Sequence, residues 1–129
     1  MGHGDLLLLA DANFPAHSHA KRLVRMEGAG MLAALNAVLG VLPIDDFEPD
    51  ALVRMQVVGA PDAVPPIVRE MQALVDRLVN AKPAIASRER FAFYELAKSA
   101  YAVIATGERA FYANLILRKG VLSPPSQSS

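Results

Sequence analysis

The apolar run Leu6–Ala10, "LLLLA", restricts the fold of this chain more than any other segment. It is short and continuous, and turn-forming residues bound it at Gly4-Asp5 and at Asp11-Ala12-Asn13. Such a run predicts a strand buried on both faces, which is typical of parallel sheets covered by helices. A helix is the alternative, but Gly4 and the breaker "NFP" after the run leave it little room.

The rest of the chain alternates between helical and extended patterns. Apolar residues recur at helical spacing over 31–39, and Gly40 stands where that helix would stop. A second helix is expected within 61–81, with Asp62 or Ala63 as its cap, Pro65 and Pro66 in its first turn and an apolar stripe of Ile67, Met71, Leu74, Val75 and Leu78. A third is expected within 88–100, capped by Ser87. Further strands are expected within 51–59, 84–86, 101–106 and 114–120.

This alternation predicts an α/β fold, a single layered domain with a mainly parallel sheet flanked by helices. We expect the domain to span residues 1–122, followed by a flexible polar tail at 123–129, "SPPSQSS".

Composition narrows the classes of function. Thirteen basic and thirteen acidic residues cancel, so no net field attracts nucleic acid or an anionic membrane. Cysteine is absent, which excludes thiolate catalysis and thiolate metal sites and is consistent with a reducing cytosol. Leu6–Ala10 is too short for a membrane span and lacks the basic region of a signal peptide. The hydrophobic content of 53% favours contacts between subunits.

Candidate site residues cluster at the ends of predicted strands. Ligands of open α/β sheets bind at the carboxyl ends of the strands, where Asp11 and Asn13 lie and where they can hydrogen-bond a polyol. The alternative is that Asp11 only caps a turn through its own backbone. His3 can exchange protons near neutral pH, or it is simply a solvated histidine near the terminus.

Other candidates are less specific. His17 is a possible wall of a polar site, whereas His19 is expected to face solvent, and no third ligand completes a metal site with them. In "RERFAFYE", Arg90 and Tyr94 suit a cluster of sugar hydroxyls, but the simpler alternative is an exposed helix start with Phe91 and Phe93 in the core. A phosphate-binding loop and a serine nucleophile elbow are both absent from the sequence.

Five segments taken together resemble the L-fucose mutarotase and D-ribose pyranase family, the RbsD/FucU family. They are "GHGD" at 2–5, "ADANFPAHS" at 10–18, "RFAFYE" at 90–95, "TGER" at 106–109 and "YANLILRKGV" at 112–121. The forms "RFAFYE" and "GHGD" are more similar to the fucose branch than to the ribose branch.

The resemblance implies a cytoplasmic enzyme without metal or other cofactor that interconverts anomers of a free monosaccharide. It implies a homo-oligomer, a pentamer ring or a decamer, with the sugar site close to a subunit boundary. The proton-transferring residue would be His3, and the sugar-binding positions would be Asp11, Arg90, Tyr112, Ala113 and Asn114. A D-ribose pyranase, and a non-catalytic sugar-binding or transport-associated module, are the alternatives.

The amino terminus departs from the family pattern. Relatives carry a leader helix before "GHGD", whereas Met1 directly precedes the motif here, so we expect that helix to be absent. A straight strand would also hold His3 and Asp11 about 25 Å apart at roughly 3.3 Å per residue. The two residues can therefore act on one sugar only if the chain folds back or if they come from different subunits.

Overall fold

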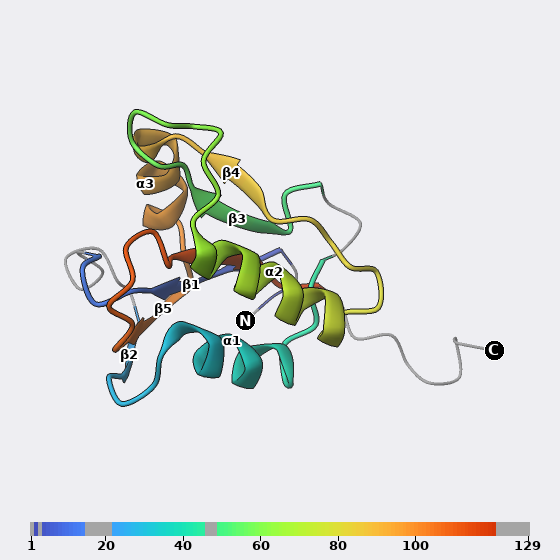
Figure 1. Ribbon diagram of the computed structural model, residues 1–129. Coiled ribbons are helices and arrows are strands. Elements are labelled where there is room, and N and C mark those ends of the chain that lie inside the picture. Colours follow the sequence, from blue (N-terminus) through green and yellow to red (C-terminus); the bar gives the residue numbers. More distant parts are fainter. Residues whose placement is uncertain (1, 3, 15–21, 46–48, 121–129) are drawn as a thin grey trace, which may run out of the picture.

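The structure is a computed structural model that describes residues 2, 4–14, 22–45 and 49–120. His3, His17 and the expected tail at 123–129 lie outside the described residues. In chain order the elements are β1 (Leu6–Ala10), β2 (Leu23–Met26), α1 (Met31–Leu39), β3 (Leu52–Met55), α2 (Pro66–Leu78), β4 (Ala86–Arg88), α3 (Arg90–Lys98), β5 (Ala102–Thr106) and β6 (Leu115–Arg118) (Figure 1).

All six strands form one mixed sheet in the order β2-β5-β1-β6-β3-β4. The pairs β1–β5, β2–β5 and β3–β4 are parallel, whereas β6 runs antiparallel to both of its neighbours, β1 and β3. The prediction of a mainly parallel sheet flanked by helices is thus confirmed, with β6 as the reversed strand. This topology brings the carboxyl ends of β1, β3 and β5 to the same edge as the amino end of β6.

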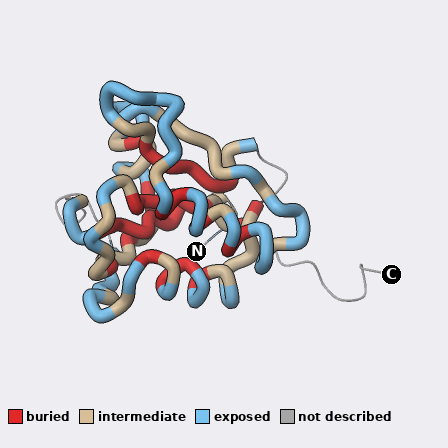
Figure 2. Tube along the Cα trace, viewed as in Figure 1, coloured by how far each residue is buried: buried red, intermediate tan, exposed pale blue. Residues whose placement is uncertain are grey.

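Strand β1 lies in the interior of the sheet, and all five of its residues are buried, as the sequence predicts (Figure 2). Alternate side chains point to opposite faces of a strand. Leu7 and Leu9 belong to the core cluster beneath α1 and α2, whereas Leu6, Leu8 and Ala10 belong to the cluster that contains Phe93 of α3. Two helices therefore cover one face of the sheet and α3 covers the other, so neither face of β1 meets water.

The three predicted helices are present, but two of them begin and end at other residues than predicted. Helix α1 matches its predicted range, while α2 is shorter than 61–81 and its N-cap is Pro65, not Asp62 or Ala63. Within the α2 stripe Leu78 is 43% exposed, because it lies in the last turn. Ser87 is not a cap, since it lies within β4. The carboxylate of Glu89 accepts hydrogen bonds from two backbone N–H groups of α3 instead.

Two further corrections concern burial and strands. Phe93 is fully buried, but Phe91 is 64% exposed, because residues two positions apart on a helix face different directions. The predicted strand within 51–59 is limited to β3, and that at 84–86 is replaced by β4. Strand β2 was not predicted, since its burial is partial and it lies at the sheet edge.

The loop after β5, which contains "TGER", forms hydrogen bonds to the end of β1 and to the start of α1. The Thr106 hydroxyl donates to the carbonyl of Ala10 at 2.8 Å, at the end of β1. Glu108 Oε1 accepts from the backbone N–H of Met31 at 3.0 Å, and Oε2 accepts from the N–H of Ala110 at 3.1 Å. Glu108 thereby caps α1, whose own N-cap, Gly30, provides no side chain. These backbone hydrogen bonds lower the pKa of Glu108 below its ordinary value of 4.5.

We expect Glu108→Gln to reduce the free energy of unfolding at neutral pH by about 1 kcal/mol, a typical value for a lost helix cap. A carboxyl group with a depressed pKa in the folded state stabilises that state above its unfolded pKa, and the contribution is lost as pH falls through the folded pKa. Urea unfolding at pH 7 and near pH 3 measures this difference. The gap between wild type and variant should shrink at the lower pH, whereas Glu70→Gln on the exposed face of α2 should show no such gap. An equal gap at both pH values would contradict the capping role.

Candidate functional site

A pocket of about 470 Å³ lies at the sheet edge where β1 and β3 end and β6 begins. Ligands of open α/β sheets bind at this kind of edge. Polar side chains line its floor and aromatic rings its walls: the lining residues are Asp11, Asn13, Phe14, Met55, Tyr94, Phe111, Tyr112 and Asn114. The structure therefore brings together the predicted residues Asp11, Tyr94, Tyr112 and Asn114, although they come from three different segments.

The floor of the pocket is built from the buried residues Asp11 and Asn114, which are 4% and 2% exposed. The backbone N–H of Asp11 donates to Asn114 Oδ1 at 2.8 Å and joins the end of β1 to the start of β6. A backbone N–H can only donate, so the amide oxygen of Asn114 must face it. The Nδ2 group of Asn114 makes no hydrogen bond within the described part of the chain, which leaves two donors for a ligand.

The Asp11 carboxylate stabilises a turn, and its burial shifts its pKa. Its Oδ1 accepts from the backbone N–H of Asn13 at 2.9 Å, so the expected Asx turn is present beside the pocket. Burial raises the pKa of Asp11 above its ordinary value of 3.8, and the nearby negative charge of Glu108 adds to this, while backbone hydrogen bonds oppose it. A buried carboxyl group of raised pKa that lines a pocket is a physical indication of a functional site.

Tyr112 holds a strained backbone conformation at the pocket rim. Its φ of 63° is in the left-handed region, which a bulky aromatic residue seldom adopts. Its hydroxyl oxygen accepts from the backbone N–H of Val58 at 3.2 Å, in the loop after β3. Since that N–H uses only an acceptor site of the hydroxyl, the Tyr112 proton remains free to be donated to a ligand. Strained residues of this kind concentrate at functional sites.

Tyr94 was predicted as a wall of the site, but the aromatic walls formed by Phe14 and Phe111 were not. Phe14 packs edge-on against Tyr94, with ring centroids 5.6 Å apart, and against the buried Phe93 at 6.0 Å. Phe111 is 70% exposed and also lines the pocket, next to Tyr112 in the chain. An exposed aromatic residue beside polar pocket groups is the feature that identifies such a wall. The only sequence indication of Phe111 was its place directly before the "YAN" segment.

Arg90 is the predicted residue that the structure does not place in this pocket. It is exposed at the start of α3, its guanidinium lies over the ring of Phe91 at 4.7 Å, and it lines a neighbouring pocket of about 310 Å³. Val58, which binds the Tyr112 hydroxyl, lines that second pocket as well.

Ala113 contributes differently from its neighbours. Its methyl group is fully buried in the core cluster beneath α1 and α2, while its backbone N–H is one of the groups that lower the pKa of Asp11. Only the backbone of Ala113 is therefore oriented toward the site. The remaining predicted residues, His3 and His17, lie outside the described residues, and their roles stay predictions.

Two further observations concern metals and membranes. Across residues 2, 4–14, 22–45 and 49–120, no group of three His, Cys, Asp or Glu side chains is arranged to hold a metal ion. Among the described helices, none has the length and apolar character needed to cross a membrane.

Fold and pocket together define a class: an α/β protein with a small pocket whose donors, acceptor and aromatic walls suit a small polyhydroxylated ligand. The chain belongs to the RbsD / FucU transport protein family, whose model matches residues 1–122.

Relatives named as fucose mutarotases are similar over most of the chain. The L-fucose mutarotase of Actinobacillus pleuropneumoniae serotype 5b is 40% identical over 94% of this chain and 84% of its own length. The fucose mutarotase of Homo sapiens is 43% identical over 95% of this chain and 83% of its own. The fucose mutarotase of Streptococcus pneumoniae, solved in complex with L-fucose, superposes with a TM-score of 0.87 at 38% identity and covers 95% of this chain and 87% of that one.

Proposed function

We propose that this protein is a monosaccharide mutarotase that interconverts the anomers of L-fucose. The observation that carries the proposal is the buried Asp11–Asn114 pair at the floor of a pocket with aromatic walls, in a chain about 40% identical to named fucose mutarotases. Relatives named for fucose support L-fucose as the sugar, and D-ribose, the sugar of the alternative pyranase activity, is compared with it in the test.

The pocket offers complementary groups to sugar hydroxyls. Asp11 is an acceptor, and the free Nδ2 of Asn114 and the free proton of Tyr112 are donors. Phe111 and Tyr94 present ring surfaces against which the C–H faces of a sugar can pack. Arg90 would contact a sugar only from the neighbouring pocket, so we assign it to the outer side of the ligand.

Mutarotation opens and recloses the hemiacetal of the sugar. The anomeric hydroxyl loses its proton, the ring oxygen gains one, and the bond between the anomeric carbon and the ring oxygen breaks to give the open-chain aldehyde. Reclosure on the other face of the carbonyl reverses both transfers, so atoms and electrons balance without a cofactor. We assign the proton transfer to a histidine, His3, because imidazole exchanges protons near neutral pH.

The position of Gly4 bears on how His3 would reach a sugar. The backbone N–H of Gly4 donates to the carbonyl of Lys119 at 2.8 Å, beyond the end of β6 that lies away from Asn114. The chain thus approaches β1 from the edge opposite the pocket, and Gly4 is about 23 Å from Asp11 at roughly 3.3 Å per residue. We infer that His3 of one copy serves the pocket of a neighbouring copy in a homo-oligomer. The pentamer ring or decamer implied by the family resemblance, and a cytoplasmic location, are part of this proposal.

The test uses NMR saturation transfer to measure the exchange between forms of L-fucose and of D-ribose, at equal protein concentration. We expect exchange of fucose well above the spontaneous rate and faster than any exchange of ribose between its ring forms. Faster ribose exchange would identify a pyranase instead. Exchange of neither sugar above the spontaneous rate, with sugar binding retained, would favour a non-catalytic binding module.

A further inference from the structure

A second polar feature lies on the opposite face of β3 from the sugar pocket. Arg54 is only 6% exposed, and its Nη2 donates a long hydrogen bond of 3.3 Å to the carbonyl of Ala63. Within the described part of the chain, its Nη1 is buried without a hydrogen-bond partner and no carboxylate forms an ion pair with it. A buried charge without a partner is strongly unfavourable, so this arginine calls for a negative group that binds beside it.

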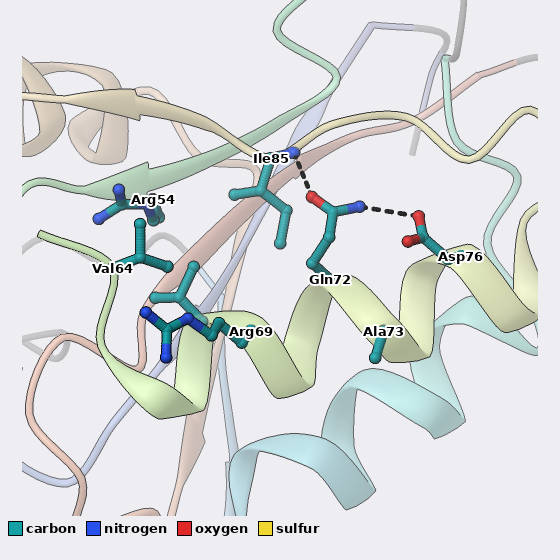
Figure 3. A pocket seen from close by; sticks show the side chains of 8 residues that line it. Arg54, Val64, Arg69, Gln72, Ala73, Asp76 and Ile85 are labelled. Atoms are coloured by element: carbon teal, nitrogen blue, oxygen red, sulfur yellow. Dashed lines mark hydrogen bonds between the residues drawn. The ribbon is translucent and has the colours of Figure 1, made fainter. Parts of the chain in front are cut away.

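A pocket of about 400 Å³ adjoins Arg54, between β3, helix α2 and the segment before β4. Figure 3 shows the guanidinium groups of Arg54 and Arg69 toward one end of this pocket, near Val64. Arg69 is exposed on α2 and forms no ion pair within the described part of the chain. Two guanidinium groups that pair with no described carboxylate thus line one small pocket.

At the other end of the pocket, the side chain of Gln72 already has hydrogen-bond partners. Gln72 Oε1 accepts from the backbone N–H of Ile85 at 2.8 Å, and its Nε2 donates to Asp76 at 3.0 Å (Figure 3). Asp76 also makes this end negative. An anion in the pocket would therefore be drawn to the arginine end and repelled from the Asp76 end.

We propose that this pocket binds a phosphate group, either inorganic phosphate or the phosphoryl group of a small metabolite, between Arg54 and Arg69. Guanidinium forks pair with phosphate through two parallel N–H···O bonds. Phosphate offers oxygens in several directions and can meet two forks, whereas a planar carboxylate is suited to one. Burial lowers the pKa of Arg54, which is the expected direction for a cation that lacks a counter-ion.

The phosphate pocket is separate from the sugar pocket. Arg54 and Met55 are neighbours on β3, and neighbouring strand residues point to opposite faces of the sheet. Met55 lines the sugar pocket on the face covered by α3, and Arg54 lines the phosphate pocket on the face covered by α2. Binding of phosphate can therefore be measured independently of the proposed sugar chemistry.

The experiment is isothermal titration calorimetry of the full chain with inorganic phosphate, with glucose 6-phosphate and with acetate, at constant ionic strength set with sodium chloride. We expect one phosphate site per chain and weaker binding of acetate. Arg54→Met and Arg69→Gln should each raise the dissociation constant at least about tenfold, as expected for a lost charge-assisted hydrogen bond. Arg77→Gln, an equal change of charge in the last turn of the same helix, should leave it within about twofold.

Several outcomes separate the alternatives. Tighter binding of glucose 6-phosphate than of phosphate supports a phosphorylated metabolite as the source, and equal binding supports inorganic phosphate. Binding of acetate as tight as that of phosphate, or equal weakening by Arg77→Gln, overturns the proposal. Failure of phosphate to bind, together with dissociation of the oligomer by Arg54→Met, would assign the pocket to a second copy of the chain. Arg69 is exposed, so Arg69→Gln tests the site even if Arg54→Met does not fold.

Discussion

Replacing His3 with alanine is expected to slow L-fucose anomer exchange by about 10²- to 10⁴-fold while sugar affinity changes little, because general acid–base help contributes about this much to a rate. The sugar contacts proposed here come from Asp11, Tyr112 and Asn114, and none of them is altered by the substitution. NMR saturation transfer measures the exchange, and calorimetry measures the affinity. His19→Ala is the matched control, since His19 is expected to face solvent. Full activity of His3→Ala would exclude His3 as the proton carrier.

A mixture of variants tests whether two copies share one site. Asp11→Asn removes the acceptor charge and should weaken sugar binding at least about tenfold. If His3 serves a neighbouring pocket, oligomers reassembled from equal amounts of His3→Ala and Asp11→Asn contain intact sites at about a quarter of their interfaces, by random pairing. At low fucose concentration the mixture should then regain about that fraction of wild-type exchange. If His3 serves its own chain, the mixture should show only the average of its two parents.

The fold was largely predictable because the apolar patterns are strong. Leu6–Ala10 has the predicted bounds, since its five buried residues match a strand covered on both faces. Helix α1 likewise has its predicted bounds. Strand β2 was missed because an edge strand with two exposed residues lacks such a pattern. The reversed direction of β6 also follows from how strands pair in space, which no local pattern specifies.

The site was less predictable than the fold. Asp11 was predicted as a site residue because it lies at the end of a strand. Its hydrogen bond to Asn114, however, joins residues 103 positions apart, and only the pairing of β1 with β6 brings them together. The walls formed by Phe14 and Phe111 depend on where two loops meet, so the sequence did not predict that these rings line the pocket. Glu108 was part of the family resemblance, but its role as a cap for α1 depends on a contact with a helix 77 positions away.

Gly107→Ala is expected to cost about 3 kcal/mol of folding free energy and to lower the melting temperature by about 10 °C. A Cβ atom at this position would overlap the backbone carbonyl oxygen of Glu27, a contact that only movement of one backbone segment can relieve. That movement would strain the hydrogen bond from the Gly107 N–H to the Ala29 carbonyl, now 2.9 Å. Thermal unfolding followed by circular dichroism measures the loss.

The same substitution should also weaken sugar binding, because the loop that holds Gly107 supports the floor of the pocket. The carbonyl of Glu108 accepts from the backbone N–H of Ala12 at 2.7 Å, directly after Asp11. A shift of Glu108 therefore moves the carboxylate proposed to bind the sugar, and fucose affinity should fall even at temperatures where the variant is fully folded. Gly28→Ala is the matched control, since a Cβ there meets nothing within 4 Å, and it should leave stability and affinity unchanged within about 0.5 kcal/mol. Equal stability of the two variants would show that the Glu27 segment yields without cost, and fucose affinity unchanged in a destabilised Gly107→Ala would show that the loop holds the fold but not the position of Asp11.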